Sequence, residues 1–217
     1  MQQKHWDVKF EQFAGNIPFP HFIIDNFFTP LEFERVTQEC SKLTFEPGAV
    51  SVLETKVHKT GLVEGVSINH NFVGELDLKY RNSLLDLLRR LAPKKVKCFD
   101  HSDFHLVRTP ANQKFKIHDD TPDKLLSTVI YLSPENNFGT FVHHTHDDQS
   151  GGVEVPWKKN RAFIFSRKEK RSWHSYRSDA NNDRLCLVYN LKSNKVSNVY
   201  FAEGLWKKAL DYKIRGK

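Results

Sequence analysis

The stretch KFKIHDDTPDKLLSTVIYLS, residues 114 to 133, places a histidine and two aspartates between two short apolar runs. Each run has the length and composition of a β-strand, and the polar residues between them are typical of a turn. His118 and Asp120 stand two residues apart, a spacing that directs both side chains to the same side of a strand end. The stretch is therefore either half of a metal site or a polar turn between two strands.

The pattern His-x-Asp occurs four times, at His5/Asp7, His101/Asp103, His118/Asp120 and His146/Asp148. The first pair lies in a polar N-terminal segment, and the second precedes the first strand that we expect in the β-rich region. The fourth lies in HHTHDDQSGG, which has the composition of a loop. The third pair alone ends a strand and is followed by further strands, so we favour it as the metal-binding pair.

The composition predicts one folded domain over residues 1–217. Hydrophobic residues make up 39% of the 217 residues and aromatic residues 12%, which is enough to build a core and excludes a globally disordered chain. The formal charge is +7, from 33 basic and 26 acidic side chains. This mild excess permits an anionic partner without requiring one.

Cysteine usage and hydropathy indicate a cytoplasmic protein. The three cysteines, Cys40, Cys98 and Cys186, are odd in number and widely spaced, which argues against a disulfide framework and a thiolate zinc site. The polar N-terminus has no apolar run of signal-peptide length, and no stretch approaches the 18 apolar residues of a membrane span.

Helices are expected before the β-rich region, as helical support over about residues 29–92. A short strand in FPHFIIDNFF precedes a helix that Thr29 can cap, with Pro30 at its first position and Glu32 completing a capping box. A second helix is expected near residues 75 to 91, and Pro93 marks its end. The last segment, GLWKKALDYKIRGK, is either a short terminal helix or a tail.

Eight short β-rich runs follow, which predicts a mainly β fold with flanking helices. Eight short strands with turn residues between them are typical of a double-sheet jelly roll, here over about residues 103–191, with the two helices on one outer face. The runs are FHLVRT, FKIH, LSTVIYLS, GTFVHH, GGVEVPW, RAFIFS, SWHSY and RLCLVYNL.

A third metal ligand should come from another strand that faces the same cavity. His174 lies in SWHSY, four expected strands after His118, and Arg184 follows ten residues later. This ordered set, together with PFPHFIIDNFF, TVIYLS and NRAFIF, resembles the Fe(II)/2-oxoglutarate-dependent dioxygenases, and most closely their prolyl 4-hydroxylase-like branch. The resemblance covers roughly residues 18 to 191 and implies a double-stranded β-helix.

The resemblance assigns a role to each residue of the set. It implies that His118, Asp120 and His174 hold Fe(II), leaving three positions of an octahedral ion for 2-oxoglutarate and O2. Arg184 would pair with the distal carboxylate of 2-oxoglutarate, because a guanidinium binds a carboxylate through two hydrogen bonds. Tyr131 would donate to the same carboxylate. Ascorbate is an optional further reductant for such enzymes.

The resemblance also implies hydroxylation of an aliphatic carbon, in a prolyl residue or a similar amino-acid carbon of a peptide, protein or small molecule. We expect no membrane partner and, without a concentrated basic and aromatic groove, no nucleic-acid partner. Two departures from the branch affect substrate identity more than the metal site. RTPANQ stands where the branch often has a tyrosine-containing loop, and Phe138-Gly139 stands where it usually has two glycines.

Two other functions stay open at this point. A cupin-like metal module would use His144, His146, Glu154 and His174, although the glycine spacing and the place of the acidic residue differ from the cupin pattern. A non-catalytic jelly roll that only binds a partner would use none of these ligands. The HHTHDDQSGG segment, with His143, is otherwise expected at the rim of the active site, and residues 50–72 lie where relatives carry a substrate-covering lid.

Overall fold

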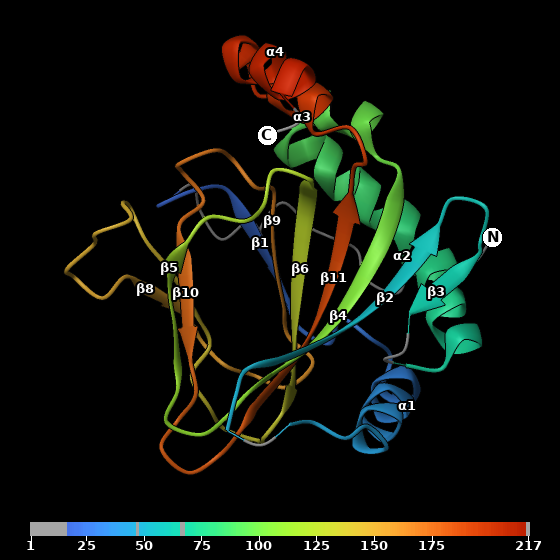
Figure 1. The fold of residues 1–217 in the computed structure, drawn as a ribbon. Helices are drawn as coiled ribbons and strands as arrows, with labels where there is room; N and C mark the ends of the chain where they lie inside the picture. Colours follow the sequence, from blue (N-terminus) through green and yellow to red (C-terminus); the bar gives the residue numbers. More distant parts are fainter. Residues whose placement is uncertain (1–16, 47, 66–67, 216–217) are drawn as a thin grey trace.

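A computed structural model describes residues 17–46, 48–65 and 68–215 of the chain. Its described strands form two antiparallel sheets, which face each other as a double-stranded β-helix (Figure 1). The major sheet has the order β1 (His21–Ile24), β9 (Ala162–Phe165), β6 (Lys124–Ser133), β11 (Arg184–Lys192), β4 (His101–Thr109), β2 (Ser51–His58) and β3 (Val63–Gly65). The minor sheet has the order β5 (Lys114–His118), β10 (His174–Arg177), β7 (Thr140–Val142) and β8 (Val153–Val155).

The eight expected strands of the jelly roll correspond to β4 through β11, so this part of the prediction is confirmed. The short strand expected before the first helix is β1, which pairs with β9 at the edge of the major sheet. The mainly β fold with flanking helices is likewise confirmed.

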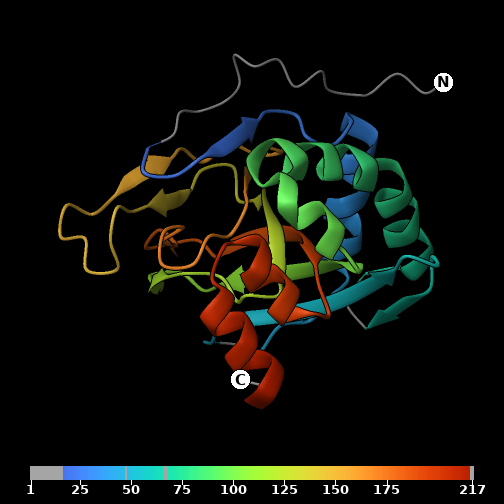
Figure 2. The same cartoon turned by 90° about the horizontal axis from the view of Figure 1, so that it is seen from above.

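Two helices cover the outer face of the major sheet, as expected (Figures 1 and 2). Helix α1 (Pro30–Ser41) begins at the predicted capping box, in which Glu32 N donates to Thr29 Oγ1 at 3.3 Å and Thr29 N donates to Glu32 Oε2 at 3.0 Å. Helix α2 (His70–Leu91) begins five residues earlier than predicted. Asn69 caps it by accepting a hydrogen bond from Phe72 N at 3.1 Å, which satisfies a main-chain donor of the first turn.

Alternation along β11 shows how the major sheet separates the core from the site. Leu187 and Tyr189 belong to the large apolar cluster that also contains residues of α1 and α2. Cys186 and Val188, on the opposite face, line a cavity between the two sheets. Because successive side chains of a strand point to opposite faces, one strand serves both the helix-covered core and the site.

Residues 50–72 form no separate lid in the part of them that the structure describes. Strand β2 pairs with β4 along its whole length, from Ser51 opposite Arg108 to His58 opposite His101, and β3 pairs with β2. In β2 the buried residues are Thr55 and Val57, which alternate with polar ones. The polar residues on its exposed face obscured the strand in the sequence, and the region expected as helical support therefore contains two strands.

Other boundaries also differ from the prediction. His101 and Asp103 lie on β4 rather than before it, because this strand extends to pair with the far ends of β2 and β11. After the core, the chain forms α3 (Val196–Ala202), which was not predicted, and α4 (Trp206–Arg215), which confirms the helical alternative for the last segment. Helix α3 packs beside η2 (Pro93–Cys98), a 3-10 helix that begins at Pro93.

The three cysteines are free and buried. Among the described residues, no helix combines the length and the apolar character needed to cross a membrane.

Candidate functional site

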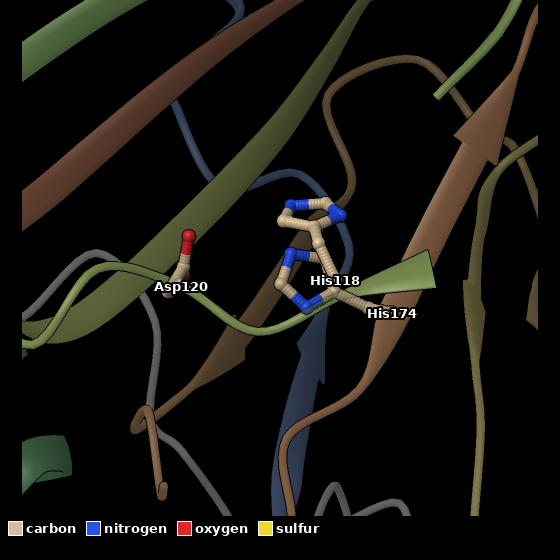
Figure 3. Close-up of side chains that lie close together, drawn as sticks. All are labelled: His118, Asp120 and His174. Atoms are coloured by element: carbon tan, nitrogen blue, oxygen red, sulfur yellow. The ribbon is translucent and has the colours of Figure 1, made fainter. Parts of the chain in front are cut away.

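The pairing of β5 with β10 brings His118 and His174 together. These two residues are direct partners in the antiparallel register of the strands, and their ring centroids lie 4.2 Å apart. Strand β5 ends at His118 and β10 begins at His174, and both imidazoles line the cavity between the sheets (Figure 3). Residues 56 positions apart in the sequence thus become neighbours.

Asp120 completes the group from the turn that follows β5. One ligand atom from each of His118, Asp120 and His174 can be chosen so that the three lie within 4.8 Å of one another. Within the described residues this is the only such group of three histidine, cysteine or acidic side chains. Figure 3 shows the Asp120 carboxylate beside the two imidazoles.

Both histidines are oriented by main-chain hydrogen bonds that leave one ring nitrogen available. The Nδ1 atom of His118 lies 3.0 Å from the carbonyl oxygen of Lys116, and that of His174 lies 2.9 Å from the carbonyl oxygen of Ser172. A carbonyl can only accept, so each Nδ1 carries the proton and each Nε2 presents a lone pair. Histidine metal ligands are commonly oriented by such bonds.

The electrostatics favour neutral imidazoles and an ionised carboxylate. Burial lowers the pKa of His174 to about 4, against the opposing charge of Asp120, and burial likewise lowers the pKa of His118. Burial by itself would raise the pKa of Asp120, but Lys124 and His174, with a hydrogen bond from Ser127, hold it well below its ordinary value. At neutral pH the group therefore offers two imidazole lone pairs and a carboxylate.

Lys124 and Ser127, both on β6, fix the Asp120 carboxylate. Lys124 Nζ lies 2.7 Å from Asp120 Oδ1, and Ser127 Oγ donates to Oδ2 at 2.6 Å. Each carboxylate oxygen has two lone-pair directions, so these bonds leave one direction on each oxygen free to bind a cation. Neither residue was predicted as part of the site, although their positions four and seven residues after Asp120 are compatible with a returning strand.

The three residues line a cavity of about 270 Å³ between the sheets. Its other walls are mainly apolar or aromatic, and they include Arg184 on β11. The walls are contributed by β2, β4, β5, β6, β7, β9, β10 and β11, with Val50, Val52, Val107, Phe115, Val129, Phe165, Tyr176, Cys186 and Val188 as the larger nonpolar or aromatic side chains. A volume just below the usual range for ligand pockets suits a small molecule better than a large one.

Arg184 is a buried cation in this cavity. Its exposed fraction is 2%, and its guanidinium lies 4.9 Å from the ring centroid of Tyr176 and 5.5 Å from that of Tyr131. Its hydrogen bonds are long, at 3.3 Å from Nε to Phe138 O and 3.4 Å from Nη2 to Thr140 Oγ1. None of the carboxylates in the described ranges forms an ion pair with it. A buried cation without a counter-ion is costly, so this geometry suits an anionic ligand.

Two other arginines, Arg108 and Arg177, could in principle pair with an anionic ligand in place of Arg184, but neither lines this cavity. Arg108 forms an ion pair with Asp183 at 2.7 Å. Arg177 is exposed and lies 4.0 Å above the ring of Phe138; it lines a neighbouring hollow and not the Arg184 cavity.

Tyr131 and Tyr176 both lie near the Arg184 guanidinium, but of the two only Tyr176 lines the cavity. The hydroxyl of Tyr131 accepts from Thr140 N at 2.9 Å and donates to Val155 O at 3.3 Å, and its ring stacks on Trp157. Tyr176 lines the cavity itself, and burial raises its pKa to about 12. It was missed in the sequence, although its position two residues after His174 placed it on the same strand face.

The structure does not assemble the cupin-like set. His144 and His146 lie in an exposed turn after β7 rather than on a strand face, and Glu154 accepts a hydrogen bond from Gly139 N at 2.7 Å. The cupin alternative is therefore wrong. Strand β7 ends at Val142 and the chain turns directly afterwards, so His144 and His146 do not alternate on a strand face.

The HHTHDDQSGG segment lines a hollow next to the cavity that contains His118. His143 and His146, with Asp148, line a hollow with residues of β5, β7 and β10. His143 Nε2 is 2.8 Å from Ser175 Oγ. This hollow shares Phe115 and Tyr176 with the cavity that contains His118, so the segment lies beside the candidate site, although none of its own residues lines that cavity. The pair His5/Asp7 lies outside the described residues.

The architecture and this group of side chains can be set beside known proteins. No family model and no curated protein matches the chain. Solved structures do match it. One is HygX from Streptomyces hygroscopicus with nickel and 2-oxoglutarate bound, with a TM-score of 0.56, 14% identity, and coverage of 87% of this chain and 88% of that one.

Two further matches come from other organisms. An oxidoreductase of the 2OG-Fe(II) oxygenase family from Burkholderia pseudomallei has a TM-score of 0.54 and 20% identity, over 79% of this chain and 85% of the other. A prolyl hydroxylase from Trichoplax adhaerens, in complex with a hypoxia inducible factor peptide fragment, has a TM-score of 0.52 and 16% identity, over 81% and 84%. This chain has the fold of the 2-oxoglutarate–Fe(II) oxygenases. At these identities the likeness concerns the fold.

Proposed function

We propose that the protein is an Fe(II)- and 2-oxoglutarate-dependent dioxygenase that hydroxylates an aliphatic C–H bond. One observation carries this proposal: a two-histidine, one-carboxylate group lines the same small cavity as a buried guanidinium that pairs with none of the described carboxylates. Two imidazoles and one carboxylate on one side of an octahedral ion are typical of non-haem Fe(II) oxygenases. The shared fold supports the same assignment.

His118, Asp120 and His174 would hold the metal. The donor set fits a divalent ion, because both Nε2 atoms carry lone pairs and both Nδ1 atoms are already hydrogen-bonded. The ionised Asp120 neutralises part of the metal charge inside the protein. Lys124 and Ser127 limit the directions in which this carboxylate can turn.

Arg184 would bind the distal carboxylate of 2-oxoglutarate through two parallel hydrogen bonds. Thr140 and Tyr176 border the same end of the cavity and can donate their hydroxyl hydrogens to it. Tyr131 would act on the cosubstrate through Arg184, whose guanidinium lies against its ring, because its own hydroxyl is bonded to main-chain groups. This differs from the direct donation that the sequence resemblance implies.

When bound, Fe(II), 2-oxoglutarate and O2 supply the chemistry, in which the oxo acid becomes succinate and CO2 and one oxygen atom reaches the substrate carbon. The chain orients the reactants and shields them. Val107, Val129 and Val188 line the cavity and exclude water from its walls. Arg184 would hold the cosubstrate at the end of the cavity that Thr140 and Tyr176 border.

We further propose that the substrate is a prolyl residue or a similar amino-acid carbon in a peptide, protein or small molecule. Support comes from the prolyl-hydroxylase-like order of motifs and from the prolyl hydroxylases among the similar structures. Val52 is 46% exposed and also lines the cavity, so β2 forms part of its entrance. A ring such as that of proline would pack against this apolar rim.

The test uses purified protein with Fe(II), 2-oxoglutarate and a library of proline-containing peptides, followed by mass spectrometry. One added oxygen on proline, absent in the His174→Ala variant, is the expected result. Succinate release that is stimulated only by free metabolites would refute the prolyl assignment while supporting the dioxygenase. No conversion of 2-oxoglutarate under any of these conditions would refute the dioxygenase and favour a non-catalytic jelly roll.

A further inference from the structure

The two segments that carry the candidate metal ligands are tied to each other by side chains outside the ligand group. His118 and Asp120 lie on one segment, the end of β5 and its turn. His174 lies on the other, which runs from the end of β9 into β10. The residue between the first two ligands, Asp119, reaches across to the second segment, where its carboxylate accepts hydrogen bonds from Ser172 Oγ and from Lys170 N, the latter at 2.9 Å.

Ser172 connects this contact to the distal histidine. Its main-chain oxygen accepts the proton on His174 Nδ1 at 2.9 Å, and its hydroxyl donates to Asp119. Asp119 therefore holds the residue that orients the His174 ring. The side chain of Ser172 is fully buried, so water does not compete for this bond.

Arg167 makes a second connection between the segments. It precedes Ser172 in the same loop, its exposed fraction is 3%, and its Nε donates to the main-chain oxygen of Asp120 at 3.2 Å. Nε also lies 3.8 Å from Asp119 Oδ2. One guanidinium thus contacts the backbone of one metal ligand and the carboxylate beside it.

The same guanidinium is anchored to the C-terminal part of the chain. Arg167 Nη1 donates to both carboxylate oxygens of Glu203, at 3.1 and 3.0 Å, and Glu203 directly follows α3. Lys95 Nζ, on η2, lies 2.6 Å from Glu203, and it also donates to Arg167 O. The side chains of Lys95, Arg167 and Glu203 are each no more than 4% exposed.

The burial of the charged side chains of Lys95, Arg167 and Glu203 is not explained by stability alone. Replacing a buried ion pair by well-packed apolar residues is often neutral or stabilising, so stability alone does not explain these charges. What charged hydrogen bonds add is direction, because donors and acceptors fix the positions of the atoms they join. Here the atoms they join lie on the two ligand-bearing segments.

We propose that Asp119 and Arg167 form a clamp that sets the spacing of the two ligand-bearing segments, and that Glu203 couples this clamp to the C-terminal helices. The proposal rests on the proposed metal-binding function and deepens it. Asp119, Arg167 and Glu203 are positioning residues, since none of them belongs to the ligand group. The clamp makes metal affinity depend on Glu203, which lies 83 positions after Asp120 in the sequence.

The experiment measures metal affinity and stability separately. Apo-protein is titrated with Fe(II) under anaerobic conditions in a calorimeter, without 2-oxoglutarate, and the thermal midpoint of each metal-free variant is recorded. The variants are Asp119→Asn, Arg167→Lys, Arg167→Met and Glu203→Gln, with Ser172→Ala as a milder change. Asp25→Asn is the matched control, because Asp25 forms a 2.6 Å ion pair with Arg161 and neither residue lines the cavity.

We expect Asp119→Asn and Arg167→Lys to weaken Fe(II) binding roughly 10- to 100-fold, the usual effect of losing groups that orient metal ligands. Ser172→Ala removes one hydrogen bond and should weaken binding roughly three- to ten-fold. Arg167→Met should weaken it more than Arg167→Lys, which keeps the charge. Glu203→Gln should also weaken binding, whereas Asp25→Asn should lower the thermal midpoint and leave the affinity unchanged.

The outcomes separate the clamp from simple stabilisation. Unchanged Fe(II) affinity in Asp119→Asn and Ser172→Ala, with lowered thermal midpoints, would show that these contacts only stabilise the fold and would overturn the proposal. Wild-type protein that binds no Fe(II) would overturn the proposed function and the clamp together. If one variant does not fold, the remaining ones still decide the question, because each alters a different contact of the clamp.

Discussion

Replacing Arg184 by methionine separates a cosubstrate-binding role from a structural one. Methionine is similar in length and apolar, so it can fill most of the space between Tyr131 and Tyr176 while removing the charge. In the structure the guanidinium is buried, and the described residues offer it no carboxylate. The substitution should therefore leave the ligand-free protein folded, with little change in its free energy of unfolding.

The same substitution should strongly weaken 2-oxoglutarate binding. A carboxylate that is buried without its cation loses ~2–5 kcal/mol of binding free energy. At 1.4 kcal/mol for each factor of ten, this corresponds to a dissociation constant raised roughly 30- to 4,000-fold. Tyr176→Phe, which removes one hydroxyl from the same end of the cavity, should raise it by roughly 3- to 10-fold.

Thermal unfolding with and without 2-oxoglutarate measures this effect without turnover, with Mn(II) in place of Fe(II). At a concentration 100 times the wild-type dissociation constant, the ligand stabilises the folded state by about 2.7 kcal/mol. For a chain of 217 residues this raises the wild-type midpoint by roughly 5–11 °C, and the Arg184→Met midpoint by at most about 3 °C.

Arg177→Met is the matched control, because Arg177 is exposed and lies outside the cavity. It should retain the full ligand-induced shift. A normal shift in Arg184→Met would refute the reasoning, since another group would then hold the carboxylate. A loss of the shift in Arg177→Met would contradict the placement of the binding site.

Alanine at His118, Asp120 or His174 should abolish both metal binding and 2-oxoglutarate turnover, as measured by calorimetry and succinate assay; one fully active variant would refute the triad. Burial, reinforced by nearby lysines, lowers the pKa of His101 from its ordinary value of 6.5 to about 4. Between about pH 4 and 6.5 this histidine is therefore protonated in the unfolded chain and neutral in the folded one. Stability to urea should accordingly fall as the pH drops through this window, and His101→Gln should flatten the dependence; an unchanged slope would contradict it. Asn160→Ala removes two buried side-chain hydrogen bonds to the main chain before α1 and should cost roughly 2–4 kcal/mol of unfolding free energy, measured by urea denaturation, whereas a loss under about 0.5 kcal/mol would show that these bonds contribute little.

Much of the fold was predictable because its local signals agree with its tertiary contacts. Thr29 and Glu32 form the expected capping box, and each of the eight β-rich runs became a strand. The strand β2 was not predicted, because it lies at the side of the sheet where only one face is buried, and its polar residues hide the alternation. Helix α3 is short and has no side-chain cap at its start, so no sequence signal marked it.

The sequence predicted the residues of the candidate site less completely than it predicted the fold. His118, Asp120 and His174 do lie together, and Arg184 lines the same cavity. Tyr131 points its hydroxyl at main-chain groups, a result that depends on the position of β7 and β8 and could not be read from its own strand. The contacts of Asp119 and Arg167 depend on a loop and a helix end that lie far apart in the sequence, so only the folded structure reveals them.

Isotope labelling tests the proposed dioxygenase most directly. Wild-type protein and the Asp120→Ala variant are incubated with Fe(II), 2-oxoglutarate and 18O2, and the succinate formed is analysed by mass spectrometry. The proposed chemistry predicts succinate that contains one 18O atom from the wild-type protein and none from the variant. Wild-type protein that forms no labelled succinate, or Asp120→Ala protein that forms as much as wild type, would contradict it.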